Sequence, residues 1–202
     1  AGCALWTVIH GVERMGIGWG DMVVVQGSGP VGLAAVAVTR EAGAARIIVT
    51  GGPEHRLARA QQFGADVIIG VEKHRDRKAL VLESTPGGYG ADVVIECVGH
   101  PAAVPEGMEY CRDGGKMLVL GQYGDAGTTP INPHVITRKQ LQLHGSWGFE
   151  PRHVLAAMEF LERTAARYPF GESVTHRFGI EQANEALETT RRWASGKSVI
   201  VP

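Results

Sequence analysis

The sequence GSGPVG, at positions 27–32, has the residue types and the spacing that could hold a phosphate group. It follows the apolar run at 22–26 and opens a stretch of helical character at 30–42. At such a strand-to-helix turn the first glycine permits a tight bend, the second lets the backbone approach a pyrophosphate, and the third allows close helix-to-strand packing. The N–H groups of the first helical turn then receive the phosphates. The predicted dinucleotide-binding residues here are Gly27, Ser28, Gly29, Pro30, Val31 and Gly32.

The end of the second apolar run, at 46–50, bears on the choice of cofactor. Enzymes that use NAD normally place Asp or Glu there to bind the ribose hydroxyls. Here Gly51, Gly52 and Pro53 follow, and a glycine leaves room for a 2′-phosphate that a carboxylate would repel. His55 and Arg56 could supply positive charge, although Arg56 could equally be a solvated helix residue. We therefore predict a site for NADP that includes Gly51, His55 and Arg56, with NAD as the alternative cofactor.

Short apolar runs alternate with helical stretches along most of the chain, which predicts a parallel sheet covered by helices on both faces. The expected strands lie at 22–26, 46–50, 67–69, 92–99, 116–121 and 141–146. The expected fold is therefore α/β, a Rossmann doubly wound sheet of six parallel strands. The fifth strand is expected to be opened by a turn at 113–115. After about residue 148 the rhythm changes to helices at 152–166 and 180–193 and two extended pieces without a sheet of their own.

Composition excludes several classes of function. The 202 residues carry a formal net charge of −1 and are 44% hydrophobic, as is typical of a globular protein with a core and not of a nucleic-acid-binding protein. No apolar run is long enough to cross a bilayer, so no membrane partner is expected. Three cysteines are too few for a disulfide framework, which favours a cytoplasmic location.

Several stretches together carry a resemblance to a known family. They are AGCALWTVIHG, GSGPVG, ARIIVTGG, FGAD, DVVIECVG, CRDGGKMLVLG, HRFGIEQANEAL and GKSVIVP. In this order they resemble the medium-chain dehydrogenase/reductase superfamily, and most closely its zinc-dependent alcohol dehydrogenase branch. The resemblance implies an oxidoreductase that transfers a hydride between an alcohol or carbonyl substrate and NAD(P), with zinc in the full-length enzyme.

The resemblance also implies a division of the chain. Residues 1–20 would link from a GroES-like catalytic domain absent upstream, residues 21–147 would form the Rossmann dinucleotide-binding domain, and residues 148–202 would return to the catalytic domain. Two zinc ligands, the proton-relay hydroxyl and any structural zinc would then lie upstream. No catalytic residue is expected in this chain, which would be inactive alone.

Further site residues follow from the resemblance. Cys3 matches the third catalytic zinc ligand, although a lone cysteine is more often a small buried hydrophobe. Thr7 matches a position beside the nicotinamide ring, and Lys197 matches a basic residue that reaches the pyrophosphate, although it could be a solvated surface lysine. The expected nicotinamide-side wall consists of Val98, Gly99, Leu120, Gly121 and Gln122.

Other positions are open between two interpretations. Trp147 either lines a substrate cleft or packs at the domain junction, and Cys97 and Cys111 are interpreted as packing residues.

Two other functions are alternatives to a zinc-dependent alcohol dehydrogenase. They are a zinc-free quinone or enone reductase of the same superfamily and an inert cofactor-binding fragment. The family's usual assemblies predict a homodimer or homotetramer.

Overall fold

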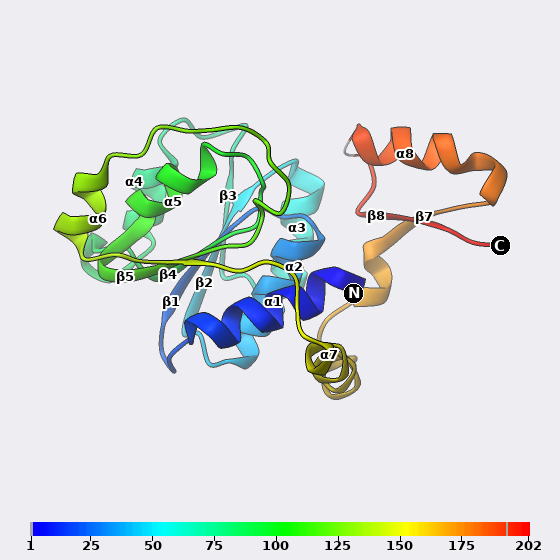
Figure 1. The fold of residues 1–202 in the computed structure, drawn as a ribbon, viewed down its shortest axis with the longest axis horizontal. Coiled ribbons are helices and arrows are strands. Elements are labelled where there is room, and N and C mark those ends of the chain that lie inside the picture. The colour runs from blue at the N-terminus through cyan, green and yellow to red at the C-terminus, as the bar shows by residue number, and fades with distance from the viewer. Residues whose placement is uncertain (1, 193) are drawn as a thin grey trace.

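The computed structural model describes residues 2–192 and 194–202, and its centre is a sheet of six parallel strands (Figure 1). The strands are β1 (Met22–Gln26), β2 (Arg46–Gly51), β3 (Val67–Gly70), β4 (Ala91–Glu96), β5 (Cys111–Val119) and β6 (Gln142–Gly145). Their order across the sheet is β3-β2-β1-β4-β5-β6. The order reverses between β1 and β4, the place where doubly wound sheets bind ligands. The predicted α/β fold is confirmed.

Helices cover both faces of this sheet (Figure 1). The helices of the structure are α1 (Gly2–Met15), α2 (Pro30–Glu41), α3 (Glu54–Gln62), α4 (Arg77–Glu83), α5 (Ala103–Tyr110), α6 (Pro133–Lys139), α7 (Pro151–Thr164) and α8 (Ala183–Arg191). α8 lies apart from this sheet, in the carboxyl-terminal segment. One apolar core joins the sheet to α1, α2, α3 and α7, and a second joins its other face to α4, α5 and α6.

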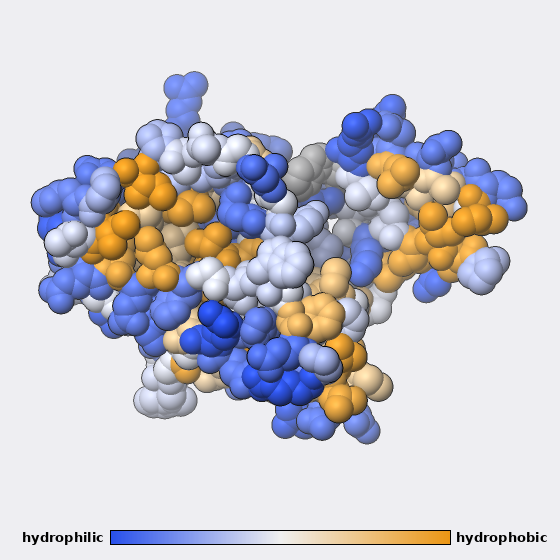
Figure 2. All heavy atoms as spheres, in the orientation of Figure 1, coloured by the Kyte–Doolittle hydropathy of each residue, from blue (hydrophilic) through white to orange (hydrophobic). Residues whose placement is uncertain are grey.

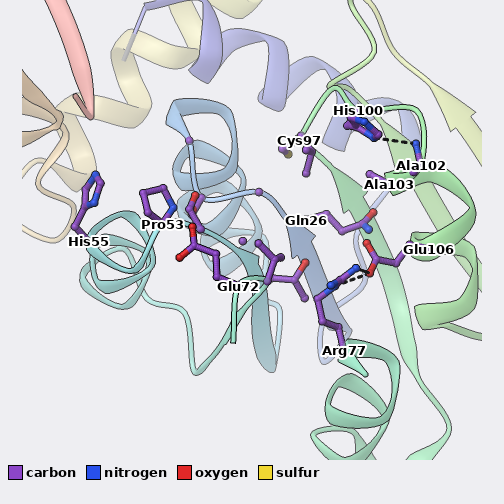
Figure 3. A pocket seen from close by; sticks show the side chains of 18 of the residues that line it. Gln26, Pro53, His55, Glu72, Arg77, Cys97, His100, Ala102, Ala103 and Glu106 are labelled. Carbon is purple, nitrogen blue, oxygen red and sulfur yellow. Dashed lines mark hydrogen bonds and ion pairs between the residues drawn. The ribbon is translucent and has the colours of Figure 1, made fainter. Parts of the chain in front are cut away.

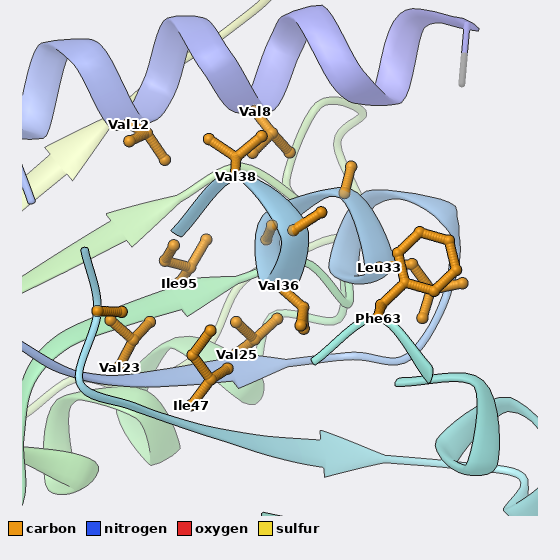
Figure 4. Close-up of a cluster of buried hydrophobic side chains, with 14 of the residues drawn as sticks. Val8, Val12, Val23, Val25, Leu33, Val36, Val38, Ile47, Phe63 and Ile95 are labelled. Atoms are coloured by element: carbon orange, nitrogen blue, oxygen red, sulfur yellow. The ribbon is translucent and has the colours of Figure 1, made fainter. Parts of the chain in front are cut away.

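Alternation along the central strands builds these two cores. Val23 and Val25 of β1 face the first core, whereas Val24 faces the second, because successive side chains of a strand point to opposite faces. The first core continues through Ile47 and Ile95 to α2 (Figure 4). Burial on both faces explains the continuous apolar runs in the sequence.

β5 differs from the sequence-based expectation. It begins at Cys111, and the predicted turn at 113–115 lies inside the strand. Ala91 pairs with Cys111 but Val93 pairs with Lys116, so the extra residues bulge out of the ladder. Gly114 takes a φ of 74° in this bulge, which glycine adopts without a steric penalty.

α1 was not expected as an element, because residues 1–20 were interpreted only as a link. Leu5, Val8 and Val12 are buried on one face of this helix, which packs against α2. A Cβ on Gly11 would lie 2.8 Å from Cδ2 of Leu120, so the helix passes close to the end of β5. The helix thereby carries Thr7 and Cys3 toward the carboxyl edge of the sheet.

The carboxyl-terminal segment has a small sheet of its own. β7 (Val174–Phe178) and β8 (Lys197–Ile200) pair in parallel, so the expectation that the tail lacks a partner strand was wrong. The helix expected at 180–193 is instead a 3-10 turn at 180–182 followed by α8, and its expected end, Trp193, lies outside the described residues.

Apolar side chains gather on the surface of this segment (Figure 2). Ile180 is 64% exposed and Leu187 is 67% exposed. An exposed apolar patch of this kind is typical of a surface used for interaction. None of the helices formed by the described residues is long and apolar enough to cross a membrane.

A buried lysine joins α6 to α5. Lys139 ends α6, and its Nζ donates hydrogen bonds to the carbonyl oxygens of Met108 (3.1 Å), Glu109 (3.1 Å) and Cys111 (2.7 Å). These carbonyls lie at the end of α5, where a helix lacks intrahelical donors. Burial lowers the pKa of this ammonium group from its usual value, and the three acceptors keep it in a polar environment.

We expect Lys139→Met to lower the free energy of unfolding by about 2–3 kcal/mol, because buried carbonyls lose a charged donor. Urea denaturation measures this change. Lys78→Met is the matched control, since Lys78 forms a half-exposed surface ion pair with Glu109, and such a pair contributes about 0–1 kcal/mol. Equal stability of the two variants would contradict the stabilising role of Lys139.

Candidate functional site: a cavity at the carboxyl ends of the strands

A cavity of about 900 Å³ opens at the carboxyl ends of β1, β2 and β4 (Figure 3). Three loops contribute to its lining: residues 27–29 after β1, residues 51–53 after β2, and residues 97–98 after β4. It therefore lies beside the reversal of strand order between β1 and β4. Of the predicted cofactor-binding residues, it brings together Gly27, Ser28, Gly29, Gly51, His55 and Val98.

The glycines of the first loop are required by three different contacts. Gly27 has a φ of 104°, and a Cβ there would lie 3.1 Å from the carbonyl oxygen of Cys97. A Cβ on Gly32 would lie 1.9 Å from the carbonyl oxygen of Gly27, which no side chain could tolerate. A Cβ on Gly29 would meet no atom within 4 Å. Gly29 therefore leaves open space at the start of α2.

The start of α2 offers free hydrogen-bond donors. Its N-cap is Gly29, which has no side chain to bond the helix, and Pro30 follows at the first helical position. The first N–H groups of a helix have no intrahelical acceptor, and they carry partial positive charge. The half-buried Val31 packs against the first core and fixes this turn to the sheet. An uncapped helix start beside open space fits a bound phosphate group.

Ser28 connects the glycine loop to the loop after β2. Its Oγ donates a hydrogen bond to the carbonyl oxygen of Gly52 (3.2 Å). The N–H of Gly27 donates to the carbonyl oxygen of Thr50 (2.7 Å). A Cβ on Gly51 would lie 2.9 Å from Oγ of Ser28. No acidic side chain fits at position 51 for this steric reason.

Polar and charged side chains line the cavity near the loop after β2. Glu72 lies closest to Gly52, since its Oε1 would lie 3.7 Å from a Cβ there, and His55 and Arg192 also line the cavity. Glu54 is held by Lys73 at 2.8 Å, and this contact lowers the pKa of Glu54. Sequence reasoning missed Glu72 and Arg192, because both lie far along the chain from the second strand's end.

Arg56 lies beside the glycine loop and connects α3 to the carboxyl-terminal segment. It is only 7% exposed, and its guanidinium donates to the carbonyl oxygen of Ser195. It lines a small cavity together with Ser28, Gly29 and Pro30, whereas the lining of the main cavity does not include it. Its contact with a phosphate group of the cofactor stays a prediction.

The floor of the cavity carries polar residues that the sequence did not single out. Arg77 of α4 and Glu106 of α5 form an ion pair with Nε–Oε1 at 2.6 Å (Figure 3). Gln26 ends β1 beside them and is 1% exposed. Its side-chain amide has no hydrogen-bond partner within the described part of the chain. Only the tertiary fold brings these three elements together.

The expected nicotinamide-side wall is divided between two places. Val98 lines the main cavity, whereas Gly99, Leu120, Gly121 and Gln122 do not. The loops after β4 and β5 nevertheless touch, since a Cβ on Gly99 would lie 2.7 Å from the carbonyl oxygen of Gly121. The buried carboxylate of Glu96 accepts hydrogen bonds from both loops. The sequence analysis did not identify Glu96.

Cys97, which was interpreted as a packing residue, remains a thiol at neutral pH. Burial raises its pKa well above the usual value, and the neighbouring Glu96 carboxylate adds to this effect. The thiolate is the form that binds metals and acts as a nucleophile. Burial likewise raises the pKa of Cys111 to about 12. Both groups are therefore protonated thiols, as expected for packing residues.

Cys3 and Thr7 lie one helical turn apart on α1, so they share a face of that helix. Cys3 is exposed and Thr7 is half-buried. Within residues 2–192 and 194–202, no group of three or more His, Cys, Asp or Glu side chains could hold a metal ion. The chemistry of an exposed thiol fits one zinc ligand, but these residues do not complete a zinc site.

Lys197 lies near the start of the helix that follows the glycine loop. This residue of β8 shares a small cavity with Pro30 and Leu33 of α2.

Trp147 lies on the surface after β6. It is 77% exposed, and its Nε1 donates a hydrogen bond to the carbonyl oxygen of Tyr123 (3.2 Å). Trp147 is therefore not buried by the described residues, and both interpretations of it stay predictions.

The chain has many known relatives in sequence. Residues 30–163 match the zinc-binding dehydrogenase family. The 5-exo-hydroxycamphor dehydrogenase of Pseudomonas putida is 38% identical over 98% of this chain and 56% of its own length. The L-threonine 3-dehydrogenase of Symbiobacterium thermophilum is 35% identical over 89% of this chain and 50% of its own length. The chain thus spans about half the length of the curated relatives it matches.

Solved structures share the fold of this chain over about half of their own length. An alcohol dehydrogenase from Thermotoga maritima superposes with a TM-score of 0.91 at 27% identity, covering 99% of this chain and 55% of its own. A zinc-binding dehydrogenase from Sinorhizobium meliloti, solved bound to NADP, superposes with a TM-score of 0.83 at 27% identity, covering 98% of this chain and 57% of its own.

We expect Gly32→Ala to lower the free energy of unfolding by at least about 3 kcal/mol, because its Cβ would overlap the carbonyl oxygen of Gly27 and push α2 off the sheet. Thermal and urea denaturation measure this change. Gly29→Ala is the control, and it should change stability by less than about 1 kcal/mol, since its Cβ enters open space. A tolerated Gly32→Ala would contradict the close contact.

Proposed function

Because the chain belongs to the zinc-binding dehydrogenase family, we propose that its large cavity binds NADP. We further propose that the full-length protein transfers a hydride between a small alcohol or carbonyl substrate and this cofactor. The bound nicotinamide would supply or accept the hydride. This chain's residues bind and orient the dinucleotide.

The start of α2 carries this proposal. Its N–H groups are uncapped, and the space beside Gly29 is open. A pyrophosphate in that space would accept hydrogen bonds from the backbone and lie at the positive end of the helix dipole. Lys197, which lies near Pro30, is placed to add a positive charge on the same side. The adenosine half would then occupy the cavity between the loops after β2 and β4.

The preference for NADP over NAD rests on the corner around Gly52. Position 51 has no room for an acidic side chain, and His55 and Arg192 could pair with a 2′-phosphate. The Sinorhizobium meliloti relative binds NADP. Among the described residues that line the cavity, Glu72 opposes the preference. The guanidinium of Arg192, the imidazole of His55 and a turn without side chains favour the phosphorylated cofactor.

We expect the full-length protein to bind NADPH more tightly than NADH, by about three- to tenfold for one added charge contact at a half-exposed site. Fluorescence titration of the reduced cofactors measures both dissociation constants. Arg192→Ala should reduce the ratio, whereas Arg191→Ala, one residue earlier on α8 and outside the cavity lining, should not. Equal affinities, or tighter binding of NADH, would contradict the NADP assignment.

The substrate side of the site is proposed to lie next to α1. Cys3 is the exposed thiol that would supply one of three protein ligands to a catalytic zinc, with the others contributed from outside these residues. A zinc with an open coordination position polarises an alcohol or carbonyl oxygen. Thr7, one turn further along the helix, would face the nicotinamide ring.

Cys3→Ala in the full-length protein should remove the catalytic zinc and leave NADPH binding within about twofold, because the thiol lies outside the nucleotide cavity. Elemental analysis measures the zinc content, and the fluorescence titration measures binding. Cys111→Ala is the control, since this buried thiol lies on β5. Zinc content that is unchanged in Cys3→Ala would defeat the ligand assignment and favour a zinc-free reductase.

We also propose that the protein assembles through the outer edge of β6. This strand ends the sheet, and Leu143 is partly exposed on it. An edge strand offers unpaired backbone groups to a second copy, which is consistent with a homodimer or homotetramer.

A further inference from the structure

Glu96 is a buried carboxylate between the two halves of the proposed cofactor site. It ends β4 and is 0% exposed. Its Oε1 accepts hydrogen bonds from the N–H groups of Val98 (2.6 Å) and Gly99 (2.7 Å). Its Oε2 accepts from the N–H of Gly121 (3.1 Å) and from Nε2 of Gln122 (3.4 Å). One side chain thus bonds the loop after β4 with one oxygen and the loop after β5 with the other.

Only a carboxylate can make this set of contacts. An ionised carboxylate accepts hydrogen bonds at both oxygens and donates none, whereas an amide has one oxygen and one NH₂ group. A buried carboxylate is costly unless hydrogen bonds replace its water. Backbone N–H groups supply most of these bonds here, and no ion pair of Glu96 occurs in the described parts of the chain.

The two loops that Glu96 joins are also in direct contact. A Cβ on Gly121 would lie 2.4 Å from the backbone nitrogen of Gly99. The backbone carbonyl of Glu96 accepts from the N–H groups of Leu120 and Gly121, both at 3.0 Å. These hydrogen bonds to the end of β4 therefore fix the position of the loop after β5. Val98 in turn lines the adenosine cavity.

We propose that Glu96 is a positioning residue that fixes the loop at 120–122 against the loop at 97–99. The spacing between the nicotinamide wall and the adenosine cavity would depend on this carboxylate. The inference rests on the proposed dinucleotide site and adds that its two halves are coupled through one buried side chain. Glu96 itself touches neither half of the ligand.

Glu96→Gln tests the coupling with almost no change in shape. The glutamine oxygen can keep the two bonds from Val98 and Gly99, which are the shorter pair. Its NH₂ group must then face the N–H of Gly121, so that contact becomes a repulsion between two donors. Gln122 can rotate its amide to accept from the new NH₂ group. The substitution thus loosens the loop after β5 and spares the loop after β4.

The readout compares a whole dinucleotide with one that lacks nicotinamide. Calorimetric titration of the full-length protein with NADPH and with 2′-phospho-ADP-ribose gives two dissociation constants, and NADH with ADP-ribose forms a parallel pair. We expect Glu96→Gln to weaken NADPH binding about tenfold, as for one lost hydrogen bond and one unpaired donor. Binding of 2′-phospho-ADP-ribose should stay within about twofold.

Two further variants distinguish positioning from general destabilisation. Lys139→Met, which removes a buried hydrogen-bonded group far from both loops, should lower stability and leave the ratio of the two dissociation constants unchanged. Gln122→Leu removes only the side-chain bond to Oε2 and should shift the ratio in the same direction by a smaller factor. It provides the test if Glu96→Gln does not fold.

Equal weakening of both ligands in Glu96→Gln, or an unchanged ratio in both Glu96→Gln and Gln122→Leu, would overturn the proposed coupling. Failure of the unaltered protein to bind either pair of ligands would instead contradict the proposed function. The two failures are therefore distinguishable in one titration series.

Discussion

The contact between two backbones at the start of α2 is the constraint on which the site depends. The Cα of Gly32 lies so close to the carbonyl oxygen of Gly27 that a single added carbon would overlap it. This approach places the first helical turn directly above the end of β1. The uncapped N–H groups of that turn then point into the space that Gly29 leaves empty. A larger residue at position 32 would separate helix and strand, and the donors would lose their fixed direction.

The reversal of strand order supplies the second half of this arrangement. Because β4 lies next to β1, the loop after β4 passes beside the glycine loop, and Gly27 contacts the backbone of Cys97. The cavity is thus formed between loops that leave the sheet in different directions. A hydrogen bond of Ser28 joins the glycine loop to the loop after β2, and the carboxylate of Glu96 joins the loop after β4 to the loop after β5. The rigidity of the site therefore comes from polar contacts between loops, above an apolar core that holds the strands in register.

The sequence predicted the parts of the site that depend on local structure. The glycine spacing between strand and helix located the loop at 27–32, and the apolar runs located the six strands. It could not place Glu72 beside Gly52 or Arg77 beside Glu106, because these pairs meet only through the order of strands in the sheet. The sequence also could not indicate the hydrogen bond from Arg56 to the carboxyl-terminal segment, whose position no local pattern indicates.

The described residues form a cavity at the carboxyl ends of β1, β2 and β4, where the adenosine half of a dinucleotide is proposed to bind, but they leave the proposed reacting side open. Cys3 is exposed, Thr7 is half-buried, and Trp147 stands out into solvent beside the ends of β5 and β6. The proposed hydride transfer and zinc chemistry would be favoured where water is excluded. This side would therefore have to be covered for that chemistry, and the side chains of Ile180 and Leu187 are likewise exposed among the described residues. The proposed cofactor site is built on the sheet, whereas the proposed reacting side lies at an exposed surface, so binding and catalysis can be tested separately.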